Sequence, residues 1–318
     1  EINETSVAVV AQAFSDYICR QNLKDPYIAI GYDGRTKSDV FASVFAEVLA
    51  KNGIRVLLSD KVCPTPFLSL YAREKKCFAG VMITASHNPA ADNGIKFKTG
   101  TGRPFTTEAT KEVEALLGSR QVPIAQGWEN LVISSDFKSL YVQYISDKIN
   151  FELIRNSDLK LLADSMYGAG QNLIQEILEE HGILSETLCS PSRNDFGGRM
   201  PEPIEKNLAP LLSGLRQGDF SFGVATDGDA DRMGVCMDGG KWLSAQETIA
   251  LLVDYVKRVR KCAGGIVKTS SVTDKVRLLG EEFGAEVFEV QVGFKYIADI
   301  METHEIAFGG EESGGFGY

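Results

Sequence analysis

The chain has 318 residues, a length that suggests about two domains or three small ones. Its apolar content of 44% and charged content of 24% are those of an ordinary globular protein, which excludes a disordered chain. A net charge of -10 at pH 7 without a basic stripe argues against a nucleic-acid-binding surface and leaves small ligands or proteins as partners.

Cysteine usage and hydropathy bear on the compartment. The six cysteines form no C-x-x-C pair and there are only three histidines, so neither a zinc site nor a disulfide framework is indicated. No stretch approaches the roughly 18 apolar residues of a membrane span, and the first residues do not resemble a signal peptide. We therefore expect a cytoplasmic protein with no nucleic-acid or membrane partner.

The first elements are predicted from periodicity. Apolar residues at helical spacing predict that the chain begins inside a helix: Val7, Val10, Phe14 and Ile18. The apolar run YIAIG (27–31) predicts a strand, and Ser38 is expected to cap a helix that stops near Gly53. IRVLL (54–58) predicts the next strand.

The same alternation recurs later in the chain. LKLLAD (159–164) leads into a helical pattern at 168–182, and GGIVKT (264–269) leads into another at 270–284 with AEVFEV (285–290) after it. Strand, glycine-rich or hydroxyl-rich loop and helix in repetition predict an α/β fold with βαβ units and mainly parallel sheets. Ligands bind such folds at the carboxyl ends of the strands.

Domain boundaries are predicted from breaks in this pattern. Periodicity is lost over 119–136, and a long loop rich in proline and glycine spans 189–205. Ser244 and Glu247 form a capping box that opens a helix, which indicates a third unit starting near 240. We expect domains at 1–148, 149–239 and 240–318.

The stretch VMITASHNPAADNGIKF (81–97) presents Ser86, His87 and Asn88 at the end of an apolar strand. A serine that carries a phosphoryl group needs only a metal on the phosphate and a base for the acceptor. The alternative is a plain turn in which Ser86 and Asn88 cap backbone groups. Lys96 weighs against the plain turn, because it lies on a predicted strand that returns toward the loop and could act as a base if desolvated.

A second stretch, VATDGDADRMGV (224–235), places Asp227, Asp229 and Asp231 at alternate positions, followed by Arg232. Carboxylates this close repel one another unless a cation neutralises them. Three oxygen ligands with positions left for water or phosphate favour Mg²⁺, while a strand-edge turn with solvated acids is the alternative. An EF-hand loop is a poor fit, because Arg232 stands where that loop needs glycine.

The third stretch, AFGGEESGGFGY (307–318), surrounds acidic and hydroxyl side chains with glycine. Glycines allow close approach of the backbone to a ligand, and Glu311, Glu312 and Ser313 offer groups that bind sugar hydroxyls. A flexible terminal tail is the alternative, and only the other two stretches favour a site here.

Taken together, TASHNP, DGDADR and GEESGG in this order resemble the signature set of the α-D-phosphohexomutases, the phosphoglucomutase and phosphomannomutase family. GYDGR and VGFKYIA resemble neighbouring segments of that family, and the resemblance covers essentially the whole chain. It implies three consecutive related α/β domains around a shared cleft. It also implies interconversion of hexose 1-phosphate and hexose 6-phosphate, with glucose, mannose or both as the sugar, through a hexose 1,6-bisphosphate.

The resemblance also implies roles for single residues. Ser86 would be the phosphoserine, and Asp227, Asp229 and Asp231 would hold Mg²⁺ together with the Ser86 phosphate. Arg35 and Arg232 would steady the phosphoserine side, Glu311 and Ser313 would read the sugar, and Lys96 with His87 or Lys295 would transfer protons.

The chain departs from the family pattern at both ends. Family members have a strand before the first helix and a fourth domain after the sugar loop, whereas this sequence stops at Tyr318. We therefore expect a truncated chain that keeps the metal site and has little mutase activity.

Two other functions remain open. An aspartyl-nucleophile phosphatase would use Asp227, but Asp231 stands where its D-x-D-x-T pattern has threonine. The second alternative function is that of a non-catalytic regulator that binds sugar phosphates. The sequence does not decide between glucose and mannose; the amino-sugar mutases resemble G-E-x-S-G-H, and Gly315 replaces that histidine, which argues against an amino sugar.

Overall fold

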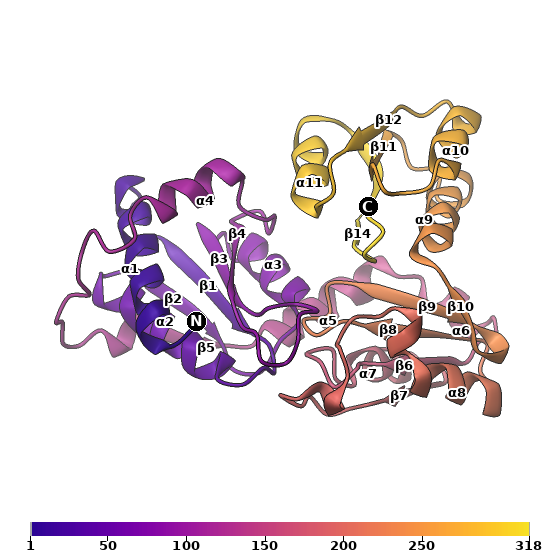
Figure 1. The fold of residues 1–318 in the computed structure, drawn as a ribbon, viewed down its shortest axis with the longest axis horizontal. Helices are drawn as coiled ribbons and strands as arrows, with labels where there is room; N and C mark the ends of the chain where they lie inside the picture. Colours follow the sequence, from indigo (N-terminus) through magenta and orange to yellow (C-terminus); the bar gives the residue numbers. More distant parts are fainter. Residues whose placement is uncertain (1, 318) are drawn as a thin grey trace.

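The computed structural model describes residues 2–317, which form three mixed sheets in succession along the chain (Figure 1). Each sheet has parallel strands and at least one antiparallel pairing toward one edge, and helices pack on its faces. The prediction of three consecutive α/β domains with mainly parallel mixed sheets is confirmed. None of the helices within residues 2–317 is both long and apolar enough to cross a bilayer.

The first sheet has the strand order β4-β3-β1-β2-β5, with β4 antiparallel to β3. Its strands are β1 (Tyr27–Tyr32), β2 (Arg55–Ser59), β3 (Ala79–Ile83), β4 (Ile95–Thr99) and β5 (Val132–Ser135). Its helices are α1 (Glu4–Arg20), α2 (Ser38–Lys51), α3 (Thr65–Glu74) and α4 (Thr107–Glu114). Helices α1, α2 and α4 cover one face and α3 the other, and α5 (Phe137–Lys148) packs beside α3.

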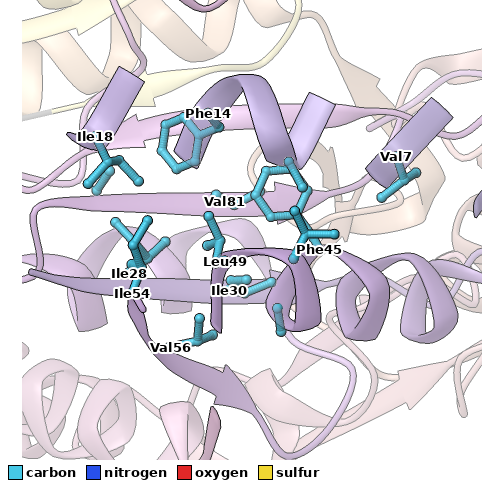
Figure 2. Packing of buried hydrophobic residues seen from close by; sticks show 14 of the residues in the cluster. Val7, Phe14, Ile18, Ile28, Ile30, Phe45, Leu49, Ile54, Val56 and Val81 are labelled. Atoms are coloured by element: carbon cyan, nitrogen blue, oxygen red, sulfur yellow. The ribbon is translucent and has the colours of Figure 1, made fainter. Parts of the chain in front are cut away.

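The core of this domain follows from the alternation of side chains along the strands. Ile28 and Ile30 of β1 lie on the α1 and α2 face with Phe14 and Phe45 (Figure 2). Ala29 between them lies on the α3 face. The helix predicted at the start of the chain is confirmed as α1. Its apolar stripe is buried in this core.

One local prediction in this domain is wrong. Ser38 was expected to cap α2, but it is the first helical residue, and Lys37 precedes it at φ 64°. The Ser38 hydroxyl donates instead to Asp33 Oδ1, at 2.8 Å. A buried carboxylate attracts this hydroxyl more strongly than the backbone N–H groups of the first turn. The predicted stop is confirmed, because Gly53 adopts φ 80° just after the helix.

The second sheet has the order β10-β9-β8-β6-β7. Its strands are β6 (Leu161–Asp164), β7 (Ser185–Leu188), β8 (Phe222–Thr226), β9 (Met233–Met237) and β10 (Lys241–Leu243). Helices α6 (Phe151–Arg155), α7 (Leu173–Glu180) and α8 (Ala209–Gln217) accompany it. The predicted start of the third domain at residue 240 needs a correction, since β10 pairs with β9 through a tight turn in which Gly239 and Gly240 have positive φ.

The third sheet has the order β12-β11-β13-β14. Its strands are β11 (Gly265–Thr269), β12 (Val287–Val290), β13 (Ile306–Gly310) and β14 (Phe316–Gly317). Its helices are α9 (Ala245–Asp254), α10 (Lys275–Phe283) and α11 (Phe294–Thr303), and a π-helical turn, Tyr255–Val259, continues α9. The predicted capping box of Ser244 and Glu247 is present at the start of α9.

A cleft of about 1280 Å³ runs between the domains. Its walls come from α1, β4 and α4 of the first domain, from Asp231 and Arg232 of the second, and from α11 and the loop before β14 of the third. In Figure 1 the loop before β14 extends toward the second domain. The sheets thus bring three loops that are far apart in sequence to one cleft.

Candidate active site

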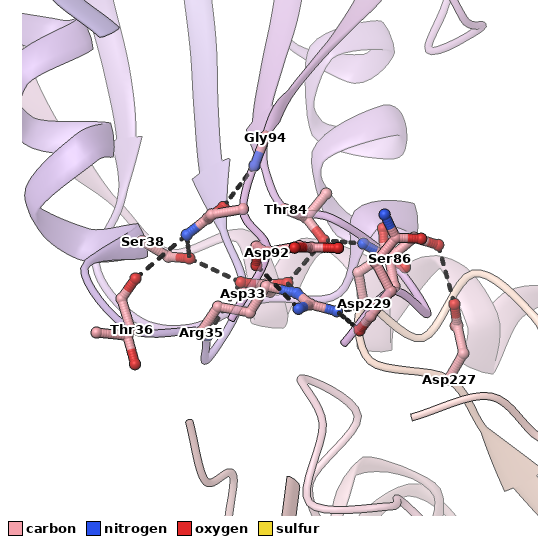
Figure 3. A network of polar contacts seen from close by, with 12 residues as sticks. Asp33, Arg35, Thr36, Ser38, Thr84, Ser86, Asp92, Gly94, Asp227 and Asp229 are labelled. Carbon is pink, nitrogen blue, oxygen red and sulfur yellow. Dashed lines mark hydrogen bonds and ion pairs between the residues drawn. The ribbon is translucent and has the colours of Figure 1, made fainter. Parts of the chain in front are cut away.

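The loop that follows β3 carries Ser86, which is 5% exposed and has φ 56°. A left-handed conformation is uncommon for serine, so the surrounding contacts must hold it. Ser86 N–H donates to Thr84 Oγ1 at 2.8 Å, and Thr84 Oγ1 donates to Asp33 Oδ2 at 2.6 Å (Figure 3). The strand end therefore fixes the direction of the serine.

Arg35 fixes the rest of this loop through its guanidinium group. Its guanidinium lies beside Asp33 and the Ser86 loop (Figure 3) and donates to Asp33 Oδ2 at 3.1 Å. It also donates to four backbone carbonyls at 2.6–3.0 Å, those of Ser86, Asn88, Pro89 and Asp92. The residue is 3% exposed, and it lies over the Phe196 ring. Because all five N–H groups are used within the chain, Arg35 shapes the loop and has no donor left for a substrate.

The three predicted metal-binding aspartates lie together. One carboxylate oxygen from each of Asp227, Asp229 and Asp231 falls within 4.8 Å of the others. Asp227 and Asp229 are fully buried, and Asp229 Oδ1 is buried without a hydrogen-bond partner. An unpaired, buried carboxylate oxygen in an acidic cluster fits a hard divalent cation, because a cation would satisfy it.

Ser86 lies against this cluster. Its hydroxyl donates to Asp227 Oδ2 at 3.1 Å, across 141 positions in sequence (Figure 3). Asp227 Oδ1 accepts from the backbone N–H groups of Asp231 and Arg232, which tightens the DGDADR turn. The structure therefore brings the serine that is predicted to carry a phosphoryl group into direct contact with a predicted metal ligand.

Lys96 and Thr65 reach the cluster from the first domain. Lys96 Nζ lies 2.9 Å from Asp229 Oδ2 and 3.5 Å from Asp231 Oδ2, and Thr65 Oγ1 donates to Asp229 Oδ2 at 2.6 Å. Thr65 was not predicted as a site residue. Thr65 is the first residue of α3 and follows Pro64. The only feature of the sequence that could have predicted it as a site residue is its position at the start of a helix that follows a strand.

The charges of the cluster shift its pKa values in opposite directions. Burial, followed by repulsion from Asp229 and Asp231, raises the pKa of Asp227 well above its usual range. Burial opposes ionisation of Asp229 too, but the Lys96 ammonium and the Thr65 hydroxyl outweigh it and lower the pKa of Asp229. Lys96 and Thr65 thus stabilise the charge of Asp229, whereas burial and the neighbouring carboxylates oppose the charge of Asp227.

The role of Lys96 in proton transfer stays a prediction, and its contacts in this arrangement favour the charged form. Burial by itself lowers the pKa of Lys96, but attraction by Asp229 and Asp231 outweighs it and raises the pKa above the ordinary value. Lys96 is therefore an ammonium ion here.

His87 and Arg232 line the cleft beside the cluster. Burial, followed by the nearby Arg232, lowers the pKa of His87, and its Nδ1 is buried without a partner. Arg232 Nε is 4.0 Å from Asp231 Oδ1, at the limit of an ion pair. Both side chains are thus available at the cleft surface next to Ser86.

The loop between β13 and β14 forms the opposite wall with Glu311, Glu312 and Ser313. The Ser313 hydroxyl donates to Glu311 Oε1, and Thr269 Oγ1 donates to Glu312 Oε2 at 2.9 Å. Gly314 adopts φ 89°, and its carbonyl accepts from Met233 N–H of the second domain at 3.0 Å. The segment is therefore a structured loop anchored on the second domain and not a free tail.

Lys295 is the predicted residue that the structure does not bring to Ser86. It is exposed on α11, does not line the cleft, and donates to Thr107 Oγ1 at 3.2 Å. Its helix faces the first domain across the rim of the cleft, so the side chain bridges the two domains.

The long loop 189–205 supports the site from the second domain. Phe196 is fully buried beneath Arg35, and the Pro201 carbonyl accepts from Gly228 N–H at 3.1 Å. The sequence predicted that this long loop has a functional role, but it did not predict the contacts of the loop with Arg35 and Gly228. No pattern within a single segment tells which distant loop it supports.

Comparison with known proteins shows family matches along most of the chain. Residues 1–121, 139–240 and 244–318 match, in turn, the phosphoglucomutase/phosphomannomutase alpha/beta/alpha domains I, II and III. A "Probable phosphoglucosamine mutase" from Methanosphaera stadtmanae is 31% identical over 96% of this chain, which spans 65% of that protein. A "Phosphoglucomutase/phosphomannomutase" from Thermococcus kodakarensis is 28% identical over 99% of this chain and 69% of its own.

Among solved structures, a "putative phosphomannomutase" from Thermus thermophilus superposes with a TM-score of 0.92 and 34% identity, over 100% of this chain and 72% of its own. The chain spans less than two thirds of the first curated relatives, with 65% and 62% coverage. With three domains matched in order, the chain belongs to the phosphoglucomutase/phosphomannomutase family, the α-D-phosphohexomutases.

Proposed function

We propose that this chain carries the phosphoserine, metal and sugar-binding sites of a phosphohexomutase. In this proposal the protein interconverts hexose 1-phosphate and hexose 6-phosphate, with glucose, mannose or both as the sugar, through hexose 1,6-bisphosphate. The observation that carries the proposal is the 3.1 Å contact between the Ser86 hydroxyl and Asp227 Oδ2. It supports a serine that transfers a phosphoryl group at an acidic cation site.

Asp227, Asp229 and Asp231 are the residues that would hold Mg²⁺, together with an oxygen of the phosphorylated Ser86. The orphaned oxygen of Asp229 supports the fit of a cation to these side chains. When bound, the ion supplies positive charge that stabilises the negative charge on the transferring phosphoryl group.

The transfer step is an exchange of two P–O bonds. The bond from Ser86 Oγ to phosphorus breaks and a bond from a sugar hydroxyl to phosphorus forms, while the proton of that hydroxyl passes through a base to Ser86 Oγ, which leaves as a hydroxyl. With its lowered pKa, His87 is the neutral group beside Ser86 that can accept this proton. The Lys96 ammonium and Arg232 offset negative charge, and Arg35 keeps the serine loop in place.

The sugar is read, in this proposal, by Glu311 and Ser313 across the cleft. Relatives that are 31–32% identical carry the name "Probable phosphoglucosamine mutase", so glucosamine phosphate belongs in the substrate panel with glucose and mannose phosphates. Gly315, where the amino-sugar pattern has histidine, favours the neutral hexoses.

The test uses the half-reaction that needs the Ser86 site alone. The chain is incubated with Mg²⁺ and glucose 1,6-bisphosphate labelled with ³²P, and the label on the protein is counted before and after hydroxylamine. We expect a hydroxylamine-stable label on Ser86 that falls at least about 100-fold in Ser86→Ala, because the transferred group then has no acceptor. Ser69→Ala, in the same cleft, should keep the label.

Other outcomes contradict the proposal and separate its rivals. A label that hydroxylamine removes would identify an acyl phosphate and so an aspartyl-nucleophile phosphatase. Binding of the bisphosphate with no label on the wild-type chain would identify a non-catalytic sugar-phosphate-binding protein. Coupled assays with 1-phosphates of glucose, mannose and glucosamine then rank the sugars.

A further inference from the structure

Side chains that the proposed reaction does not use fix the loop after β11, residues 270–273. Lys268 of β11 is 2% exposed, and its ammonium donates to the Val272 carbonyl at 3.0 Å. Gln246 of α9 donates to the Ser271 carbonyl at 2.9 Å and accepts from a backbone N–H of the same loop at 2.6 Å. A short loop at the carboxyl end of a parallel strand is thus held from two sides, at the edge where such folds bind ligands.

A carboxylate of the cleft is anchored on this strand end. Thr269, the last residue of β11, is fully buried, and its hydroxyl donates to Glu312 Oε2 at 2.9 Å. The same hydroxyl oxygen lies 3.2 Å from Ser271 Oγ. Burial opposes ionisation of Glu312, but hydrogen bonds from Ser271, from its own backbone and from Thr269 outweigh burial and lower its pKa. Glu312 is therefore a carboxylate ion tied to the third sheet.

The loop between β13 and β14, to which Glu312 belongs, needs such anchors. Four glycines flank residues 311–313, two on each side. A glycine-rich backbone has much conformational freedom to lose, so contacts with other elements must hold it. On one side Met233 N–H donates to the Gly314 carbonyl and holds the loop on the second domain. The bond from Thr269 holds the middle of the loop on the third domain.

Recognition of sugar hydroxyls requires acceptors that are already in place, because ordering them during binding costs affinity. Glu311 and Ser313, the proposed sugar-reading residues, are the two neighbours of Glu312 in the chain. We propose that Thr269 is a positioning residue of the sugar site: by holding Glu312, it fixes the two side chains beside it for the sugar. Thr269 does not itself line the cleft, so it acts through Glu312. This inference rests on the proposed function and adds the end of β11 to the sugar site.

The test compares a ligand that has ring hydroxyls with one that has none. In a Ser86→Ala background with Mg²⁺ present, calorimetry gives the affinities for glucose 1,6-bisphosphate and for 1,6-hexanediol bisphosphate. Thr269→Val has the same size but no hydroxyl. It should weaken binding of the sugar bisphosphate about tenfold, because two side chains must then be ordered on binding, and should change binding of the diol bisphosphate less than about twofold. Thr269→Ser keeps the hydroxyl and should stay within about threefold of the parent for both ligands.

Thr248→Val is the matched control. It removes the hydroxyl of another buried threonine of the third domain, which donates to the Ser244 carbonyl at the start of α9 and does not line the cleft. This variant should bind both ligands like the parent. A double-mutant cycle separates positioning from damage to the fold: in a Glu312→Ala background, Thr269→Val should change neither affinity, because the bond that it removes is already absent.

Each other outcome overturns a stated part. Equal affinity of Thr269→Val and the parent for the sugar bisphosphate overturns the inference. An equal loss for both ligands also overturns it, since the variant would then damage the cleft in general, and so does a loss that persists in the Glu312→Ala background. A parent that binds both ligands equally overturns the sugar-reading role of the loop, whereas a parent that binds neither overturns the proposed function itself.

Discussion

At the scale of single residues, Arg35 shows how a charged side chain can serve a site without facing it. Its donors are all bound to the Ser86 loop and to Asp33, and its guanidinium is buried over Phe196. A planar group with five N–H bonds matches acceptors that lie around it on several sides, whereas a lysine offers three donors on one atom. The loop therefore depends on the shape of the arginine as well as on its charge.

This dependence predicts the effect of Arg35→Lys. The variant leaves backbone carbonyls of the loop unpaired, and we expect the free energy of unfolding to fall by about 2–4 kcal/mol, because each hydrogen bond to a charged group contributes roughly 1.5–3 kcal/mol. Denaturant unfolding measures this loss, and labelling of Ser86 should slow at least about tenfold as the serine loses its direction.

A matched control is Arg193→Lys, which changes an arginine paired with Asp195 at the surface. An exposed pair contributes about 0–1 kcal/mol, so this variant should be close to wild type. If both variants lost the same stability, the network under Ser86 would not have the role that we give it.

At the scale of elements, the contact between the serine loop and the DGDADR turn depends on a glycine. A Cβ at Gly228 would lie 2.4 Å from the Ser86 carbonyl, and that carbonyl already accepts from Arg35. Two loops from different domains can touch here only because one residue has no side chain. The 3.1 Å contact between Ser86 and Asp227 follows from this close approach.

Gly228→Ala should therefore separate the two loops. We expect a loss of about 1–3 kcal/mol in the free energy of unfolding, the usual effect of overpacking, and at least about a tenfold slower labelling of Ser86. Gly118→Ala is the control: its φ of 70° strains an alanine by about 1–2 kcal/mol, but the added Cβ meets no atom within 4 Å and Gly118 does not itself line the cleft. Normal labelling in both variants would show that the loops tolerate separation.

Elements also show how far the sequence could predict this structure. The strands YIAIG and IRVLL and the αβ alternation follow from periodicity, and the metal turn follows from like charges at alternate positions, because both signals are local. Thr65 and Phe196 could not be predicted as site residues, since each acquires its partner only when two domains meet. The Pro201 carbonyl could not be predicted either, because its partner Gly228 lies far away in sequence. Ser38 was misassigned because its partner, the buried Asp33, lies outside the helix.

At the scale of the whole molecule, polar contacts around the cleft join the domains, in addition to the apolar packing of Leu173 against the core that contains Phe67. Arg103 and Glu302 form an exposed ion pair between the first and third domains, and Lys295 and Thr107 form a hydrogen bond between the same two. Such pairs contribute little free energy each. The contacts of Ser86, Thr65 and Lys96 with the aspartates join the first and second domains at buried positions, so charge in that cluster acts on the arrangement of both.

This connection predicts that Mg²⁺ stabilises the chain as a whole. Three aspartates exceed the single Lys96, so a divalent cation should bind the folded protein and raise the free energy of unfolding by about 2.7 kcal/mol at 100 times its dissociation constant. The measurement is the thermal midpoint in EDTA and in rising Mg²⁺.

Asp227→Asn is the variant that tests the origin of this effect. The asparagine keeps the size of the side chain and an oxygen for the N–H groups of Asp231 and Arg232, but it removes one of three like charges from a fully buried position. In EDTA the free energy of unfolding of the variant should be about 1 kcal/mol higher than that of the wild type, because a buried charge that is kept for metal binding lowers the stability of the metal-free protein. The thermal midpoint of the variant should no longer respond to Mg²⁺. If the thermal midpoint of the variant rose with Mg²⁺ as much as that of the wild type, the ion would bind elsewhere, and the three aspartates would not form the Mg²⁺ site.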